Sequence, residues 1–215
     1  MKRLVLLRHG QTAWNAEGRG QGHADVPLDE TGRLQAKAAA AVLAGYHPSS
    51  LWSSDLSRAA QSAQYVADAT GLTPTHDARL REYSLGERTG LTMDEFATRF
   101  PAEYAVFRTG RFEPVPGGER AHEVLARFLP ALADVAAGLG EGETAVVVSH
   151  GAALRLALVH LLGWPRAADL TLSGLENSGW AVLSQVEQDG PTRWRLSAYN
   201  VTAQDPDFAS GPGVG

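Results

Sequence analysis

The sequence predicts a three-layer α/β/α fold with a mostly parallel central sheet. Two short apolar runs carry this prediction, Leu4–Leu7 and Thr144–Val148, because neither has helical periodicity and each ends in polar residues. A third short apolar run, Leu51–Ser53, lies between these two. The segments between the runs have the capping residues and the apolar spacing that are typical of helices. Strands that alternate with helices run parallel, so helices are expected on both faces of the sheet.

Capping residues place the helices between the strands. Asp29 is a helix N-cap and Gly45 a stop signal. The apolar stripe of this helix is expected to comprise Leu34, Ala38, Ala41 and Val42. In chain order, the elements expected after the first strand are a helix from Asp29 to about Leu43, the strand Leu51–Ser53, a helix capped by Asp55 or Ser57 that ends at Gly71, a short helix with the capping box Thr92 and Glu95 that reaches about Phe100, a helix over roughly Glu119–Leu139, the strand Thr144–Val148, a helix to about Leu162, and a hairpin of Gly179–Val186 and Thr192–Ala198 that turns at Asp189-Gly190.

Length and composition limit the kind of protein. The 215 residues, 44% of them hydrophobic, suffice for one globular domain, which we place at residues 1–202, with a mobile Gly/Pro-rich tail at 203–215. There is no cysteine, which excludes disulfides, thiolate catalysis and cysteine-based zinc sites. A net charge of −5 argues against bulk nucleic-acid binding, and no signal peptide or membrane helix is recognisable. We therefore expect a cytoplasmic protein with no nucleic-acid or membrane partner. The sequence does not decide whether the protein forms a homodimer.

Two histidines lie directly beyond strand ends, and a glycine follows each. The segment Arg8–Gly10 follows the first strand, and Ser149–Gly151 follows the last of the apolar runs. The carboxyl ends of parallel strands form the ligand-binding edge of an open α/β sheet, so both imidazoles are expected there. A helix that begins after His150 favours an anion at its N-terminus. Because Arg8 and Arg58 carry guanidinium groups that match phosphate oxygens, the sequence predicts a phosphate site.

These residue types are suited to phosphoryl transfer through a histidine nucleophile. A deprotonated ring nitrogen attacks phosphorus while a partner on the other nitrogen fixes the tautomer, and water later hydrolyses the phosphohistidine. Guanidinium groups stabilise the charge that spreads over the phosphoryl oxygens. The leaving oxygen needs a proton, and Glu82 is the candidate general acid.

The segment Arg8–Asn15 and a series of shorter blocks carry a family resemblance. In chain order the blocks are Gln21-Gly22 with Asp25, Pro27 and Leu28, then Thr31-Gly32, Ser53–Ala59, Leu80–Glu82 with Gly86 and Gly90–Thr92, Pro116–Glu119, and Val148–Gly151. Together they resemble the phosphoglycerate-mutase-like branch of the histidine phosphatase superfamily and extend over about two-thirds of the chain. The resemblance implies a phosphoglycerate-mutase-like fold and a phosphatase that needs neither a metal nor a cofactor.

Carried over position by position, the resemblance implies a role for each residue of the site. His9 is the phosphorylated residue, and Glu82 is the proton donor. The residues implied to bind phosphate or the near end of the substrate are Arg8, Asn15, Gln21, Gly22, Arg58, His150 and Gly151, with Arg8, Arg58 and His150 also counted as catalytic. The implied partner is a small phosphorylated metabolite. The chain looks similar to actinobacterial members that dephosphorylate glucosyl-3-phosphoglycerate or related sugar phosphates, so this substrate ranks first.

The sequence departs from the family pattern at two positions and leaves two alternative functions open. Arg88 stands in a pair that is commonly aromatic and acidic, Arg120 stands where serine is frequent, and neither is expected to touch the phosphate pocket. A phosphoglycerate mutase would need a longer and more basic segment than residues 92–116, which offer Arg99, Arg108 and Arg111, so a phosphatase is favoured. The third hypothesis is a non-catalytic phosphate-binding module, against which the complete set of candidate catalytic residues argues.

Overall fold

A six-stranded sheet forms the centre of the computed structural model, which describes residues 1–109, 114–165, 171–186 and 193–205. The strand order is β3-β2-β4-β1-β5-β6, with β1 to β4 parallel and β5 and β6 antiparallel to their neighbours. The strands are β1 (Arg3–Arg8), β2 (Ser50–Ser53), β3 (Thr75–His76), β4 (Thr144–Ser149), β5 (Trp180–Val186) and β6 (Arg193–Val201). The α-helices are α1 (Ala13–Ala16), α2 (Glu30–Ala44), α3 (Ser57–Thr70), α4 (Met93–Arg99), α5 (Pro101–Phe107), α6 (Ala121–Ala137) and α7 (Gly151–Leu161), and short 3₁₀ turns are η1 (Ala78–Leu80) and η2 (Gly86–Arg88).

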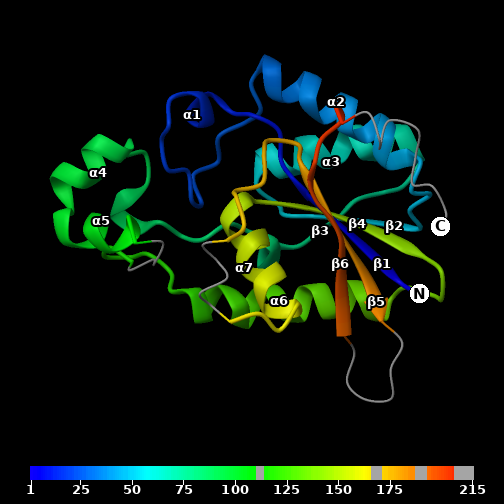
Figure 1. Cartoon of the computed structure of the whole chain (residues 1–215). Coiled ribbons are helices and arrows are strands. Elements are labelled where there is room, and N and C mark those ends of the chain that lie inside the picture. The colour runs from blue at the N-terminus through cyan, green and yellow to red at the C-terminus, as the bar shows by residue number, and fades with distance from the viewer. Residues whose placement is uncertain (110–113, 166–170, 187–192, 206–215) are drawn as a thin grey trace.

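The sheet lies between two helical layers, which confirms the predicted fold class. Figure 1 shows α2 and α3 on one face and α6 and α7 on the other. Alternate residues of β1 divide the core, because successive side chains of a strand point to opposite faces. Leu4 and Leu6 pack in the cluster with α6 and α7, whereas Val5 and Leu7 pack in the cluster with α2 and α3. Every residue of β4 is buried, as expected for a central strand of a covered sheet.

The pairing of β1 with β4 brings the two predicted site segments together. The register aligns Arg8 with Ser149, the last residue of each strand. The His9 amide donates to the Ser149 carbonyl at 3.0 Å, which extends the ladder by one more bond. His9 and His150 therefore leave the same sheet edge from adjacent strands, although 141 positions separate them in the sequence.

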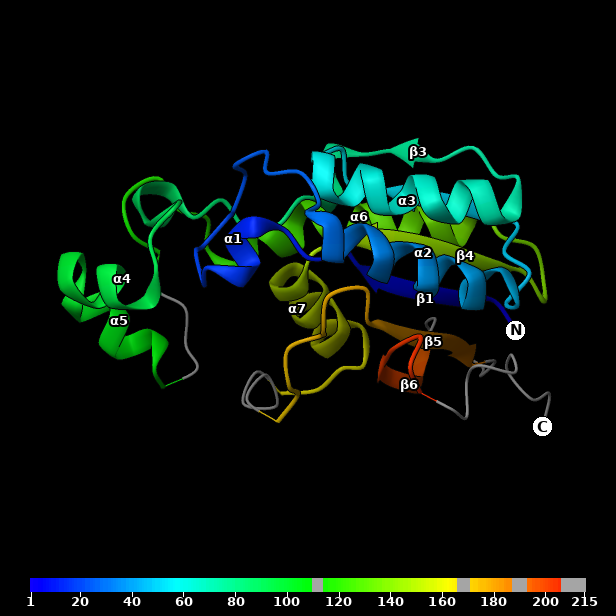
Figure 2. The ribbon, with the colours of Figure 1, turned by 90° about the horizontal axis from the view of Figure 1, so that it is seen from above.

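The pair α4 and α5 forms a small helical cap at one end of the molecule. Figure 2 shows both helices set apart from the sheet, beyond α1. Phe96 is buried at the centre of the cap, with the rings of Phe100, Tyr104 and Phe107 around it at centroid distances of 6.3, 5.6 and 6.0 Å. The expected end near Phe100 marks a break between two helices, because Pro101 is accepted at the first position of the new helix.

Two details of the predicted helices are wrong. In α2, Leu34 is 65% exposed, and the buried face comprises Gly32, Ala36, Ala39, Ala40 and Leu43. An alanine-rich helix offers more than one apolar face, and the small residues are those that allow close packing. In α3, the N-cap is Leu56, and neither Asp55 nor Ser57 caps with its side chain. The carboxylate of Asp25 instead accepts from the Ser57 amide at 2.7 Å, while Asp55 pairs with Arg81.

Some expectations lie outside the described residues. These are the hairpin turn at Asp189-Gly190, the position of Arg111, and most of the tail 203–215. Within the described ranges, none of the helices has the length and apolarity that crossing a bilayer requires.

Candidate active site

His9 is held as a neutral imidazole with one nitrogen free to act as a nucleophile. Its Nδ1 lies 2.7 Å from the Gly10 carbonyl oxygen, which can only accept, so Nδ1 carries the proton and Nε2 keeps its lone pair. The ring is 3% exposed and lines the pocket described below. Burial, followed by the positive charges of Arg58 and Arg8, holds the pKa of His9 well below its usual 6.5. The imidazole is therefore unprotonated at neutral pH, as nucleophilic attack requires.

His150 lies directly beside His9 with both of its ring nitrogens in use. The two ring centroids are 5.2 Å apart at an interplanar angle of 60°. Nδ1 accepts from Arg58 Nε at 3.2 Å, so Nε2 carries the proton and donates to the Ser54 hydroxyl at 2.9 Å. The side chain is fully buried, and burial lowers its pKa well below 6.5, with Arg58 adding to the effect. In this arrangement His150 positions Arg58 and the His9 ring, and its contact with a phosphoryl group stays a prediction.

Arg58 is fixed by backbone carbonyls of the loop that precedes α2. Its guanidinium donates to the carbonyls of Gly22 and Ala24, both at 2.7 Å, as well as to His150. The side chain is 1% exposed, and burial lowers its pKa to about 10, so it stays cationic at neutral pH. Gly22 suits this role because its φ is +53° and a Cβ there would lie 2.9 Å from the Leu85 amide nitrogen.

Arg8 presents an unused hydrogen-bond donor. One of its terminal nitrogens donates to the Leu175 carbonyl, but Nε is buried without a partner among the described residues. The side chain runs across Gly151, where a Cβ would stand 3.4 Å from Nε. Since a buried unpaired donor is costly, an anion in the pocket is the natural acceptor for this group.

The carboxylate of Glu82 caps α7 at the edge of the pocket. Oε1 accepts from the Tyr83 and Ala153 amides, and Oε2 accepts from the Ala152 amide, each at 2.9 Å. The helix N-terminus, which we expected to hold a ligand anion, thus holds Glu82 through the Ala152 and Ala153 amides, while Gly151 and Ala152 both line the pocket. The negative charge of Glu82 also favours the charged forms of Arg8 and Arg58.

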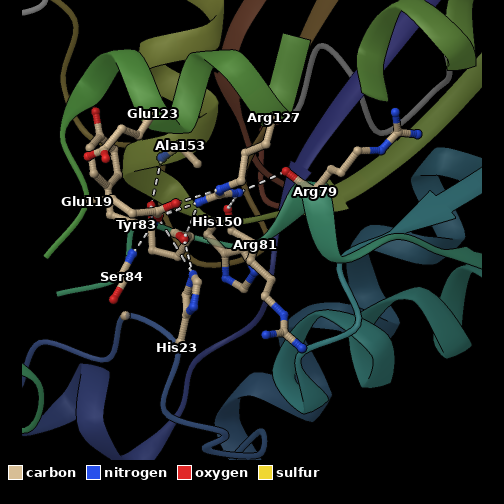
Figure 3. A network of polar contacts seen from close by, with 12 residues as sticks. His23, Arg79, Arg81, Tyr83, Ser84, Glu119, Glu123, Arg127, His150 and Ala153 are labelled. Atoms are coloured by element: carbon tan, nitrogen blue, oxygen red, sulfur yellow. Dashed lines mark hydrogen bonds and ion pairs between the residues drawn. The ribbon is translucent and has the colours of Figure 1, made fainter. Parts of the chain in front are cut away.

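A second layer of polar contacts holds the loop that carries Glu82. Figure 3 shows Arg127 of α6 pointing into this loop, where its guanidinium donates to the carbonyls of Arg79, Arg81 and Glu82 at 2.7 to 2.8 Å. The same guanidinium bonds both carboxylate oxygens of Glu119 at 2.9 and 2.8 Å. On the other side, Nε2 of His23 lies 2.7 Å from the Glu82 carbonyl oxygen and donates to it.

The side chains converge on a pocket of about 670 Å³. Of the residues predicted for the site, those that line it are Arg8, His9, Asn15, Gln21, Gly22, Arg58, Glu82 and Gly151. His150 lies behind this wall. Asn15 uses Oδ1 to accept from Thr12 and from Asn177, whereas Oε1 of Gln21 is buried without a partner among the described residues. The volume is typical of a site for a whole small metabolite rather than for a phosphate alone.

The far part of the pocket contains residues that the sequence did not assign. Arg88, which the sequence placed outside the phosphate pocket, lines the larger cavity that contains that pocket, whereas Arg120 is the N-cap residue of α6 and does not line it. Arg19 and Arg155 line it too, and Met93 and Phe107 bring the cap into its wall. No sequence signal marked these residues, because only the fold brings α4, α5 and α7 to one cavity.

Arg127 and His23 were also missed as supporting residues, whereas the sequence left Asn177 between a supporting role and a hairpin-entry turn. Asn177 donates to the His9 carbonyl at 3.2 Å, and its position just before β5 was the one available signal. Among the described residues, no group of three or more His, Asp or Glu side chains is placed to hold a metal ion.

Comparisons with known proteins identify the family. The model of the histidine phosphatase superfamily (branch 1) matches residues 4–202. The chain belongs to the histidine phosphatase superfamily. The resemblance inferred from the motifs is thereby confirmed.

Several relatives are similar over nearly their whole length. A glucosyl-3-phosphoglycerate phosphatase of Mycobacterium tuberculosis is 38% identical over 94% of this chain and 96% of that protein. A solved structure of a mycobacterial glucosyl-3-phosphoglycerate phosphatase with VO3 has a TM-score of 0.86 at 38% identity, covering 94% of this chain and all of that one. A probable phosphoglycerate mutase of Yersinia pestis is 37% identical over 93% of this chain and 90% of that protein.

Proposed function

We propose that this histidine phosphatase superfamily member hydrolyses phosphate monoesters through a phosphohistidine on His9. One observation carries the proposal above the others. A neutral imidazole whose proton is fixed on Nδ1 exposes its Nε2 lone pair to a pocket that contains the guanidinium groups of Arg8 and Arg58. Nucleophile and charge stabilisation are therefore present at the same point before any substrate arrives.

The reaction proceeds in two steps with balanced atoms. Nε2 of His9 forms a bond to phosphorus as the bond from phosphorus to the ester oxygen breaks, and Glu82 gives a proton to the departing oxygen. Water then attacks the phosphohistidine, the bond from Nε2 to phosphorus breaks, and Glu82 takes the proton from that water. Arg8 and Arg58 hold the equatorial oxygens in both steps. For Glu82 to donate, it must enter the first step carrying a proton, which the second step restores, and one of its oxygens must exchange an amide contact at α7 for the leaving oxygen.

The substrate we propose is glucosyl-3-phosphoglycerate. The similar mycobacterial proteins bear that name, and the match extends over 94% of the chain. The pocket has room for a sugar beside the phosphorylated acid. The partner that we propose is therefore a small phosphorylated metabolite and not a nucleic acid. We further propose that the protein acts in the cytoplasm and that residues 1–202 form a single domain. Light scattering on the purified protein distinguishes a monomer from the homodimer that the sequence leaves open.

The alternative is a phosphoglycerate mutase, since one group of similar proteins carries that name. The decisive experiment measures phosphate release from glucosyl-3-phosphoglycerate beside interconversion of 3- and 2-phosphoglycerate. We expect release to dominate, and dominant interconversion would overturn the phosphatase assignment.

Two variants test the nucleophile. His9→Ala should abolish phosphate release, whereas His160→Ala, which removes an exposed histidine at the far end of α7, should leave the rate unchanged. If His9→Ala retained the full rate, the protein would use another group as its nucleophile, and the mechanism above would be wrong.

A further inference from the structure

Arg88 is a buried cation that has no acidic partner among the described residues. Its side chain is 7% exposed, and its guanidinium carbon lies 4.4 Å from the ring centroid of Phe96 and 4.5 Å from that of Phe107. The one polar contact of its terminal nitrogens is with the Met93 sulfur at 3.8 Å. No described carboxylate pairs with it. Burial lowers its pKa, which is the mark of a charge that the protein itself does not compensate.

The cation stands in the wall of the same pocket as the nucleophile. Arg88 and His9 both line it, with the cap residues Met93 and Phe107 beside Arg88. Arg155 enters the pocket from α7 and forms no ion pair with a described residue. Arg19 is different, because it already pairs with Glu17 and Glu95 at 2.9 Å each. Within the part of the chain that the structure describes, no carboxylate therefore offsets the positive charge at this second place, which is apart from the phosphate-binding guanidinium groups.

Aromatic rings hold the Arg88 guanidinium in place without satisfying its N–H groups. Stacking against a ring fixes the plane of a guanidinium and leaves its edge free for hydrogen bonds. A carboxylate matches that edge with two parallel bonds, and it would supply the missing negative charge. A neutral hydroxyl would satisfy donors but leave the charge uncompensated.

We propose that Arg88, assisted by Arg155, forms a second anion-binding subsite that takes the carboxylate of an acidic phosphomonoester while the phosphoryl group lies against His9. This inference rests on the proposed phosphatase function and specifies the chemical class of its substrate. It predicts a preference for esters with an anionic group beyond the phosphate over esters with a neutral tail.

The test compares glucosyl-3-phosphoglycerate with its methyl ester, which differs in the charge of the carboxylate. The readout is the ratio of kcat/KM for the acid to kcat/KM for the ester, which does not depend on the fraction of enzyme that is folded. The wild-type protein should favour the acid, and Arg88→Met should lower that ratio about ten- to hundredfold, the worth of a hydrogen-bonded charge. The loss should fall on KM rather than kcat, because the carboxylate is bound equally in the ground state and the transition state.

Two further variants separate charge from packing. Arg88→Lys keeps the cation and should retain most of the preference. Arg99→Met is the matched control, since Arg99 also stacks on a ring of the cap, that of Phe100 at 5.2 Å, but pairs with Glu87 and does not line the pocket. It should leave the ratio unchanged. An unaltered ratio in Arg88→Met, or equal losses on both substrates, would overturn the subsite.

Failure of the proposed function would be seen separately, as absence of phosphate release by the wild-type protein from either compound. Calorimetric titration with the same acid and its methyl ester then still tests the subsite. Tighter binding of the acid that Arg88→Met abolishes would support it, and equal affinities in the wild-type protein would refute it.

Discussion

Replacement of Arg127 by methionine should damage both stability and proton transfer, although this residue does not line the pocket. Arg127 donates five hydrogen bonds, three to loop carbonyls next to Glu82 and two to Glu119. Breaking a buried ion pair costs about 3–5 kcal/mol of unfolding free energy. Because the Arg127 side chain is 20% exposed, we take the lower value, about 3 kcal/mol. For a chain of this length each kcal/mol lowers Tm by about 2–4 °C, which gives a drop of about 6–12 °C.

The effect on catalysis should depend on the leaving group. General acid catalysis contributes about 10²–10⁴-fold to a reaction whose leaving group needs a proton. Arg127→Met leaves the bonds from Glu82 to the amides of α7 intact, so we expect partial loss, about tenfold in kcat/KM for an alkyl phosphate, from misalignment of this acid. The kcat/KM for p-nitrophenyl phosphate should change less than about twofold, because kcat/KM reports the first step, in which that leaving group departs without a proton.

The assay is steady-state phosphate release from both compounds, with thermal unfolding followed by circular dichroism. Glu82→Gln should show the same dependence on the leaving group with a larger loss. Arg79→Met is the control, because Arg79 belongs to the same loop but its side chain is exposed and its ion pairs with Asp77 and Asp134 are screened by water, so they contribute little to stability. Equal losses on both substrates, or a rate on the alkyl phosphate like that of the wild type, would refute the positioning role of Arg127.

Three further predictions concern the site and its support. Because the pKa values of His9 and His150 are lowered in the folded protein, the unfolded chain binds more protons below pH 6.5, and the free energy of unfolding should fall as pH drops below 6.5. The acid limb of the pH profile of kcat/KM should likewise lie below 6.5. Urea midpoints and rates measured as a function of pH check both expectations, and an acid limb at or above 6.5 would contradict a neutral His9. Arg58→Met should lower kcat/KM about 10²–10³-fold by removing a donor to the developing charge, and a loss under fivefold on any phosphomonoester would contradict its role. Gly32→Ala should destabilise by about 1–3 kcal/mol because its Cβ would lie 2.0 Å from the Gln11 carbonyl oxygen, and an unchanged urea midpoint would show that the two segments are not packed this closely.

The fold and the meeting of the two histidines at one sheet edge could be predicted from the sequence because their signals are local. Apolar runs mark β1 and β4, and the histidine after each strand needs only parallel pairing to meet the other. The Asp29 cap and the capping box at Thr92 are likewise satisfied by residues within the next turn, and the structure shows both.

Features that depend on contacts between distant segments were not predictable. The start of α3 is capped by Asp25, 32 positions earlier, so the nearer Asp55 was a reasonable but wrong choice. The buried face of α2 could not be predicted from apolar periodicity, because the helix itself has alanines on several of its sides. The position of Arg88 in the larger cavity was not predictable, because nothing in its neighbourhood along the chain shows that α4 and α5 fold back to form a wall.

Rapid-quench isolation of the protein during turnover, followed by mass spectrometry and ³¹P–¹⁵N correlation NMR, tests the central claim most directly. Because Nδ1 of His9 donates to the Gly10 carbonyl, a phosphoryl group should be found on Nε2 of His9. A turning-over protein with no phosphoryl group on His9, or with one on Nδ1, would contradict the account.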